Sequence, residues 1–307
     1  MIFLTFVHQE TSLNDLVGKT ESRILDEIMT SYPSYNWKTQ AIIATFIIQT
    51  VPVIVMALVY TCLKKFVRDS KNSLLIQLMY AFTFGSIMGD VFFHIFPSLN
   101  NYHTQDGKVF ERHQQIRMHY YFVGGMILSY FLEVIINRLF SNPCNQNSDL
   151  NEDESRDKRG DSSPVILAFF GDFFHNFADG LAIASTFGLS PKLGLTTAVA
   201  SFIHEIPDEI GDFAYLYKNG YGYRQALSYQ LLTGFGSIMG AFTSFTFSGN
   251  TTIEMVAVSG GLFTYMSLLV FLNDLRDSSR ISWAIANTIL IFLGLYVMQT
   301  VALFQKS

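Results

Sequence analysis

The chain has 307 residues, of which 50% are hydrophobic and only 15% are charged, and its mean hydropathy is positive. A soluble domain carries roughly 25% charged residues, so this composition is typical of a protein embedded in a lipid bilayer. The formal net charge of −5 is spread over loops, which excludes the basic surface that a nucleic-acid partner requires.

Residues 1–40 precede the first apolar segment and form a predicted lumenal or extracellular segment. Residues 1–7 are apolar, but they are short and lack a basic region before them, so a cleaved signal sequence stays an open alternative. Cys62 and Cys144 both fall on the side that the orientation below makes cytosolic, where a disulfide is not expected.

Eight segments have the length and flanks of membrane-spanning helices, because a helix needs about 20 mostly apolar residues to cross the hydrocarbon core. They are residues 41–63, 74–99, 119–140, 164–189, 193–217, 226–247, 254–273 and 281–304. The first, second, third and eighth are clear from hydropathy alone, whereas the fourth and fifth contain many polar residues. We therefore expect an all-α, polytopic membrane protein.

The loops between these spans predict the orientation, because cytosolic loops are enriched in Lys and Arg. The loops after spans one, three, five and seven hold twelve such residues, whereas those after spans two, four and six hold four. The odd-numbered loops are therefore predicted to be cytosolic and both termini to be lumenal or extracellular.

One polar segment divides the membrane domain. Residues 141–163 are polar, mixed in charge and free of aromatic residues, so they predict a disordered cytosolic loop between spans 1–3 (residues 41–140) and spans 4–8 (residues 164–305). The sequence FGSIMG occurs at residues 84–89 and again at 235–240, and its small-xxx-small spacing predicts close helix packing.

Span four carries a stripe of polar residues inside an apolar helix. Asp172, His175 and Asp179 recur at spacings of three and four, so they share one helix face, with Asn176 beside them. An ionised side chain near the bilayer centre costs about 2.5–3.5 kcal/mol on insertion scales, so this stripe must face a partner, water or a cation.

Span five repeats the pattern. His204 and Asp208 share one face, and Glu205, Glu209 and Asp212 form a neighbouring stripe. Imidazole together with carboxylate matches first-row divalent metals. Pro207 removes a backbone hydrogen bond within this span, and interrupted helices at membrane depth mark substrate sites in transporters. The alternative is a buried polar network that only holds the helices together.

These residues resemble the ZIP family of zinc/iron-regulated-type metal transporters, in its LIV-type branch and near its Ke4/Catsup-like members. HNFADG at residues 175–180 is similar to the family's HNFxDG signature, and HEIPDE at residues 204–209 is similar to HEIPHE. Gly89 to Pro97 is similar to the branch's GDxxxHxxP. The resemblance covers roughly residues 40–305.

The resemblance implies eight helices in a three-two-three arrangement, with a two-metal centre between spans four and five. It implies that the first metal is bound by His175, Asp179, His204 and Asp208. It implies that Asn176 and Glu205 bind the second metal, with the two acids Asp179 and Asp208 bridging. It also suggests transport into the cytosol, location in the endoplasmic reticulum or Golgi rather than the plasma membrane, and a possible homodimer.

Two positions depart from the family pattern. Asp208 stands where LIV-type members have His, and this harder oxygen ligand could widen acceptance from Zn²⁺ toward Mn²⁺ or Fe²⁺. Cd²⁺ is a further possible substrate. The loop at residues 141–163 contains no His, so a His-rich regulatory loop is not carried over.

Weaker candidates lie outside the two motifs. Asp90 and His94 in span two are an accessory metal site or a packing pair, and Asp172, Glu209 and Asp212 are further accessory candidates. Residues 100–118 and the start of span three, with His103, His113 and His119, are either a metal-gathering surface or a solvated loop. Glu133 in span three favours a partner within the bundle over a metal.

The predicted function is transport of a divalent metal, with zinc as substrate and no bound cofactor or enzymatic activity. The alternative is an intramembrane zinc hydrolase, because His204 and Glu205 open an HExxH motif. Asp208 stands where the second His is needed, and neither Ser nor Cys neighbours the cluster as a nucleophile.

Overall fold

The protein is described by a computed structural model that covers residues 36–68, 74–101, 111–140, 163–247, 249–272, 275 and 281–305. Within these ranges it is all-helical, without strands, as predicted. Most of the N-terminal segment, most of the loop at residues 141–163 and the loop residues His103, Asp106 and Cys144 lie outside the described residues.

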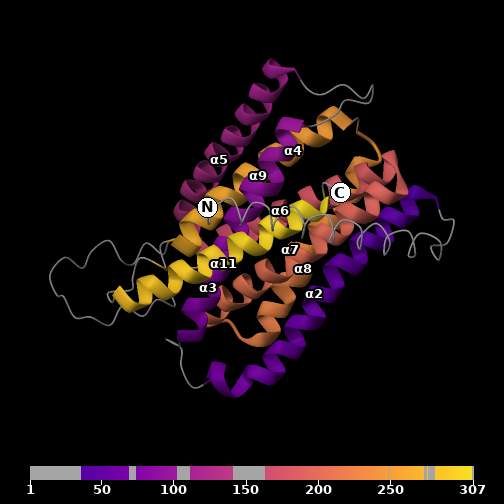
Figure 1. The fold of residues 1–307 in the computed structure, drawn as a ribbon. Coiled ribbons are helices and arrows are strands. Elements are labelled where there is room, and N and C mark those ends of the chain that lie inside the picture. The colour runs from indigo at the N-terminus through magenta and orange to yellow at the C-terminus, as the bar shows by residue number, and fades with distance from the viewer. Residues whose placement is uncertain are drawn as a thin grey trace, which may run out of the picture.

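The helices run roughly alongside one another in a single bundle, with α5 at one edge, α2 at the opposite edge and α6 and α7 between them (Figure 1). Their bounds are α2 Trp37–Arg68, α3 Leu74–Asp90, η1 Val91–Ile95, α4 Phe96–Asn101, α5 Arg112–Phe140, α6 Ser163–Leu189, α7 Pro191–Lys218, α8 Tyr223–Ser244, α9 Gly249–Ser267, η4 Leu268–Leu272 and α11 Ile281–Gln305. Each predicted span overlaps one of these helices or a run of them.

Among the residues that the structure describes, three helical stretches are long and apolar enough to cross a membrane by length and composition: residues 76–100, 112–139 and 281–303. They correspond to the second, third and eighth predicted spans. The first predicted span is not among them, although it is apolar in sequence, and neither are the polar spans four and five.

Close helix pairs form where glycine removes a side chain from the contact. An added Cβ at Gly85 would collide with the backbone oxygen of Ile291, which places α3 directly against α11. In the same way, Gly236 meets the backbone of Phe173 and Gly240 that of Phe177, which places α8 against α6. The packing role predicted for both copies of FGSIMG is therefore confirmed.

The connection between α6 and α7 is a single residue, Ser190. Its side chain accepts a hydrogen bond from the Leu193 amide, and Pro191 occupies the first helical position, which needs no amide donor. α7 then continues without interruption through Pro207 to Lys218. Because the link is so short, α6 and α7 pack as neighbours, and their polar stripes face each other.

Candidate metal centre

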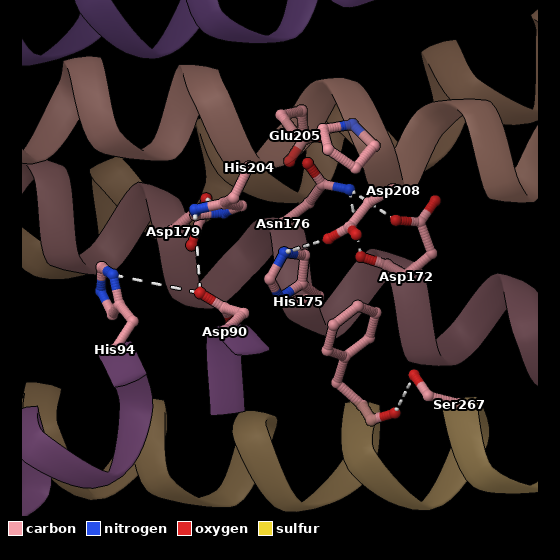
Figure 2. Close-up of polar contacts among 12 residues, drawn as sticks. Asp90, His94, Asp172, His175, Asn176, Asp179, His204, Glu205, Asp208 and Ser267 are labelled. Carbon is pink, nitrogen blue, oxygen red and sulfur yellow. Dashed lines mark hydrogen bonds and ion pairs between the residues drawn. The ribbon is translucent and has the colours of Figure 1, made fainter. Parts of the chain in front are cut away.

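Four side chains from the two motifs converge in the buried middle of the bundle. His175 and Asp179 come from α6, and His204 and Glu205 come from α7. One ligand atom from each lies within 4.8 Å of the others, and all four side chains are buried or nearly so. Figure 2 shows these side chains pointing toward one another across the two helices. These four residues are close enough together to be able to hold a metal ion.

Direct contacts hold the imidazoles in place. His204 Nε2 lies 2.9 Å from Asp179 Oδ2, and His175 Nε2 lies 3.5 Å from Asp208 Oδ2. The ring of Phe263 on α9 stacks on His175 with its centroid 4.0 Å away and fixes the plane of that imidazole. Asp208 therefore contacts the centre through His175, although it is not one of the four converging residues.

Asn176, next to His175 on α6, makes hydrogen bonds to Asp172 on the same helix and to Gln49 on α2. Its Nδ2 donates hydrogen bonds to the backbone oxygen of Asp172 at 3.1 Å and to Asp172 Oδ1 at 2.9 Å (Figure 2). Its Oδ1 accepts a hydrogen bond from Gln49 Nε2 on α2, which also donates to Glu205 Oε1 at 3.2 Å. Asn176 and Glu205 are thus joined through a third helix.

Asp90 and His94 extend the cluster. Asp90 Oδ1 lies 3.8 Å from His204 Nδ1 and 4.0 Å from His94 Nδ1 (Figure 2). Asp90, His94 and His204 form a second group that could hold a metal ion, and it shares His204 with the first group. His94 lies on the π-helical turn Val91–Ile95, an irregularity frequent at functional sites.

Many ligand-type atoms in this cluster have no hydrogen-bond partner among the described residues. These buried atoms are His175 Nε2, His204 Nδ1, Glu205 Oε2, Asp208 Oδ2, Asp90 Oδ1, His94 Nδ1 and Asp172 Oδ2. A buried polar atom without a partner is costly, and nearly all such atoms in native proteins are paired. Nitrogen and carboxylate oxygen atoms gathered in this way fit a divalent metal in chemistry as well as in position.

Glu209 and Asp212 lie farther along α7. Glu209 is buried, both of its carboxylate oxygens lack a hydrogen-bond partner, and its backbone oxygen accepts a hydrogen bond from Gln230 on α8 at 3.0 Å. Asp212 lies on α7 three residues beyond Glu209, about one helical turn farther along. Neither belongs to the groups of converging ligand atoms.

Two further predictions have clear outcomes. Glu133 pairs within the bundle as predicted, because Tyr265 Oη on α9 donates a hydrogen bond to Glu133 Oε2 at 2.5 Å. His113 is mostly exposed and lies 3.3 Å from the equally exposed Glu111, whereas His119 bonds the backbone oxygen of Gln115. These histidines lie apart from the buried centre.

Sequence reasoning missed Gln49 and Phe263. For Gln49 the sequence does carry a signal: it is a polar residue in an apolar run, and Gln40 and Thr45 precede it by nine and four residues. Phe263 carries no such signal, because it is one of 29 phenylalanines.

Comparisons with known proteins give relatives that are named zinc transporters. The chain is 31% identical over 177 residues to human zinc transporter ZIP10, covering 54% of this chain and 21% of that protein. It is 25% identical over 286 residues to zipt-7.1 of Caenorhabditis briggsae, covering 76% of this chain and 73% of that protein. It is 28% identical over 220 residues to YKE4 of Saccharomyces cerevisiae, covering 68% and 57%. The chain therefore spans only about a fifth of the length of human ZIP10.

The family description "ZIP Zinc transporter" matches residues 35–165 and 162–302, which together include both polar motifs and all of the described helices but the last three residues of α11. The resemblance seen in HNFADG and HEIPDE is thus confirmed over most of the chain. The chain belongs to the ZIP zinc transporter family.

Proposed function

We propose that this protein moves a divalent metal ion, zinc first, across a membrane through a centre between α6 and α7. The observation that carries the proposal is the convergence of His175, Asp179, His204 and Glu205, with ligand atoms within 4.8 Å of one another. Weak, exchangeable oxygen ligands beside two imidazoles suit a site that must release its ion, unlike a closed structural zinc site.

We assign two metal positions within this centre. His175, Asp179, His204 and Asp208 bind the first metal, and Asn176 and Glu205 bind the second, with Asp179 and Asp208 between them. Among the described residues, His175 Nε2, His204 Nδ1, Glu205 Oε2 and Asp208 Oδ2 are buried and make no hydrogen bond, which supports this assignment. Asp90 and His94 form an accessory position that reaches the centre through His204.

A cavity of about 230 Å³ supports an access route that ends at His94. Hydroxyl groups dominate its polar lining, among them those of Ser98, Ser185, Thr186, Thr196 and Thr252. Hydroxyl oxygens replace part of the hydration shell of a cation without binding it tightly. By the distribution of Lys and Arg, this end of the bundle is the lumenal or extracellular one, so we infer transport from there into the cytosol.

The membrane architecture is part of the same proposal. We propose eight spanning helices in a three-two-three arrangement, with a lumenal or extracellular segment at residues 1–40, spans at 41–140 and 164–305, and a cytosolic loop at 141–163. The family match over residues 35–165 and 162–302 supports this architecture, and the helices of the two halves pack against each other, α2 against α6, α7 and α8 and α3 against α11. We place the protein in the endoplasmic reticulum or Golgi, possibly as a homodimer, with Mn²⁺, Fe²⁺ and Cd²⁺ as competing substrates.

An intramembrane hydrolase finds no comparable support. Asp208 occupies the second histidine position of an HExxH motif, and its carboxylate contacts His175. The relatives are named zinc transporters, and this chain shares their family motifs.

The test is metal uptake by vesicles that contain the full chain or a variant. We expect His175→Ala to abolish zinc uptake, because it removes a ligand, and Asp208→Ala to reduce it strongly. Zinc uptake at the wild-type rate by both variants would show that the assigned centre is wrong. Competition among Zn²⁺, Mn²⁺, Fe²⁺ and Cd²⁺ in the same vesicles measures selectivity.

A further inference from the structure

Gln49 brings a buried amide from α2 into a centre whose sequence motifs lie on α6 and α7. Its side chain is 8% exposed and lies in a mostly apolar stretch of α2. Nε2 donates one hydrogen bond to Asn176 Oδ1 and another to Glu205 Oε1. Both acceptors belong to the second metal position of the proposed function.

The surrounding contacts determine which way the amide faces. Asn176 Nδ2 is committed to Asp172, with hydrogen bonds to its backbone oxygen and its carboxylate, so Asn176 turns its oxygen toward Gln49. Glu205 Oε1 accepts the other hydrogen bond from Gln49. Two oxygens therefore face Gln49, and only its NH₂ group can satisfy both. That NH₂ group carries partial positive charge at the place where a cation would contact the same two oxygens.

The oxygen of the same amide is buried and has no hydrogen-bond partner among the described residues. It lies over Gly234 of α8, where an added Cβ would come within 2.7 Å of it. The last torsion of a glutamine side chain is broad and roughly two-fold, so a half-turn exchanges NH₂ and oxygen with little movement of the rest of the chain. After the half-turn, three oxygens face one another, an arrangement that a divalent cation would stabilise.

We propose that Gln49 is a switchable metal ligand: its NH₂ group holds Asn176 and Glu205 in place without metal, and its Oε1 binds a divalent cation shared with them. The proposal rests on the proposed function and adds a third helix to its second metal position. It also gives that position a ligand set made of oxygen, which favours harder cations than the imidazole-rich first position does.

The experiment uses the full chain in lipid nanodiscs and three variants. Gln49→Leu removes both donor and acceptor, Gln49→Glu keeps an oxygen but cannot donate when ionised, and Gln40→Leu is the matched control. Gln40 is also a buried amide on α2, nine residues away, or about 13 Å along the helix axis. Zinc and manganese binding are measured by equilibrium titration, and thermal unfolding is measured without metal.

We expect both Gln49 variants to unfold at lower temperature without metal, because Asn176 and Glu205 lose their donor. Gln49→Leu should weaken binding of the second metal by about tenfold, the lower end of the effect of altering a metal's supporting groups. Gln49→Glu should strengthen it, most of all for Mn²⁺, because a carboxylate replaces a neutral oxygen. Gln40→Leu should leave metal binding unchanged.

Opposite effects on affinity separate a ligand from a structural cross-link. Tighter metal binding by Gln49→Leu would show that the amide only competes with the metal, which overturns the proposal. A change of the same sign in both Gln49 variants, or an equal change in Gln40→Leu, would also overturn it. Suppose that wild type binds zinc, that His175→Ala weakens this binding and that Gln49→Leu does not change it. The inference about Gln49 would then be wrong, while the proposed function would still stand. Absence of zinc binding by wild type would overturn the proposed function together with it.

Discussion

α5 and α11 each pack along one side and leave most of their apolar surface exposed, whereas α6 and α7 carry polar stripes and bury them inside the bundle. Only 22% of the most apolar stretch of α5 and 17% of that of α11 are buried within the protein. Large side chains on these helices, such as Tyr120 and Phe292, are well exposed. In α6 and α7, by contrast, His175, His204 and Glu205 are each no more than 3% exposed. Hydropathy identifies both of these helices, although the ligand-type residues lie elsewhere; of the three stretches it identifies, only residues 76–100 carry members of the cluster, Asp90 and His94.

The difference has a physical cause. A helix that faces lipid must be apolar over most of its surface, so composition alone marks it. A helix that carries imidazoles and carboxylates must be shielded from lipid by its neighbours, because each exposed charge costs about 2.5–3.5 kcal/mol near the bilayer centre. This contrast between the outer helices, α5 and α11, and the site helices, α6 and α7, can be tested with single substitutions.

The largest expected effect is at His204, which contacts both groups of ligands. His204→Gln removes a nitrogen 2.9 Å from Asp179 and 3.8 Å from Asp90, and it should lower zinc uptake by more than about 100-fold, beyond the usual effect of altering a supporting group. Uptake by vesicles matched for protein content is the measurement. Thr288→Val on α11 is the control and should transport normally; comparable losses in both variants would contradict the contrast.

Adjacent glycines on α5 test packing of an outer helix. An added Cβ at Gly125 would collide with the backbone oxygen of Val258 on α9, whereas nothing lies within 4 Å of a Cβ at Gly124. Gly125→Ala should destabilise the protein by about 1–3 kcal/mol, the usual cost of overpacking, and Gly124→Ala should be neutral or slightly stabilising. Thermal unfolding in detergent measures both, and equal unfolding temperatures for the two variants would refute the close α5–α9 contact.

Asp208→His should sharpen selectivity at the site. Replacing an oxygen ligand beside His175 with imidazole favours zinc over harder cations, so the ratio of zinc to manganese uptake should rise by about tenfold, or about 1.4 kcal/mol. Competition between the two metals in vesicles measures the ratio, and Asp208→Asn separates loss of charge from gain of imidazole. An unchanged ratio in Asp208→His would mean that this position does not set selectivity.

The smallest effect is expected at Tyr265, whose hydroxyl bonds Glu133 between α9 and α5. Tyr265→Phe should cost about 0.6–1.7 kcal/mol, the range measured for hydrogen bonds between membrane helices. Thermal unfolding should detect the loss while metal affinity stays at the wild-type value. A drop in metal affinity would place this pair in the transport machinery rather than in the packing of the outer helices.

Much of the centre could be predicted because its residues are close together in sequence. Helical periodicity alone places Asp172, His175 and Asp179 on one face of α6, and the same rule aligns His204 with Asp208 on α7. The link from His204 to Asp90 could not be predicted in this way, because those residues are far apart in the chain. The hydrogen bonds of Gln49 with Asn176 and Glu205 and the stacking of Phe263 on His175 could not be predicted either, because they also join residues far apart in the chain.

By itself, the sequence determined the membrane class, the two polar stripes and the family, because each depends on composition or on local spacing. Only the tertiary structure decided that Glu205 joins His175, Asp179 and His204, that Asp208 reaches the centre through His175, and that α2 contributes Gln49. Those facts depend on how separate helices are rotated and set against one another. That arrangement comes from long-range packing such as the contacts of Gly236 and Gly240 with α6, which local spacing does not encode.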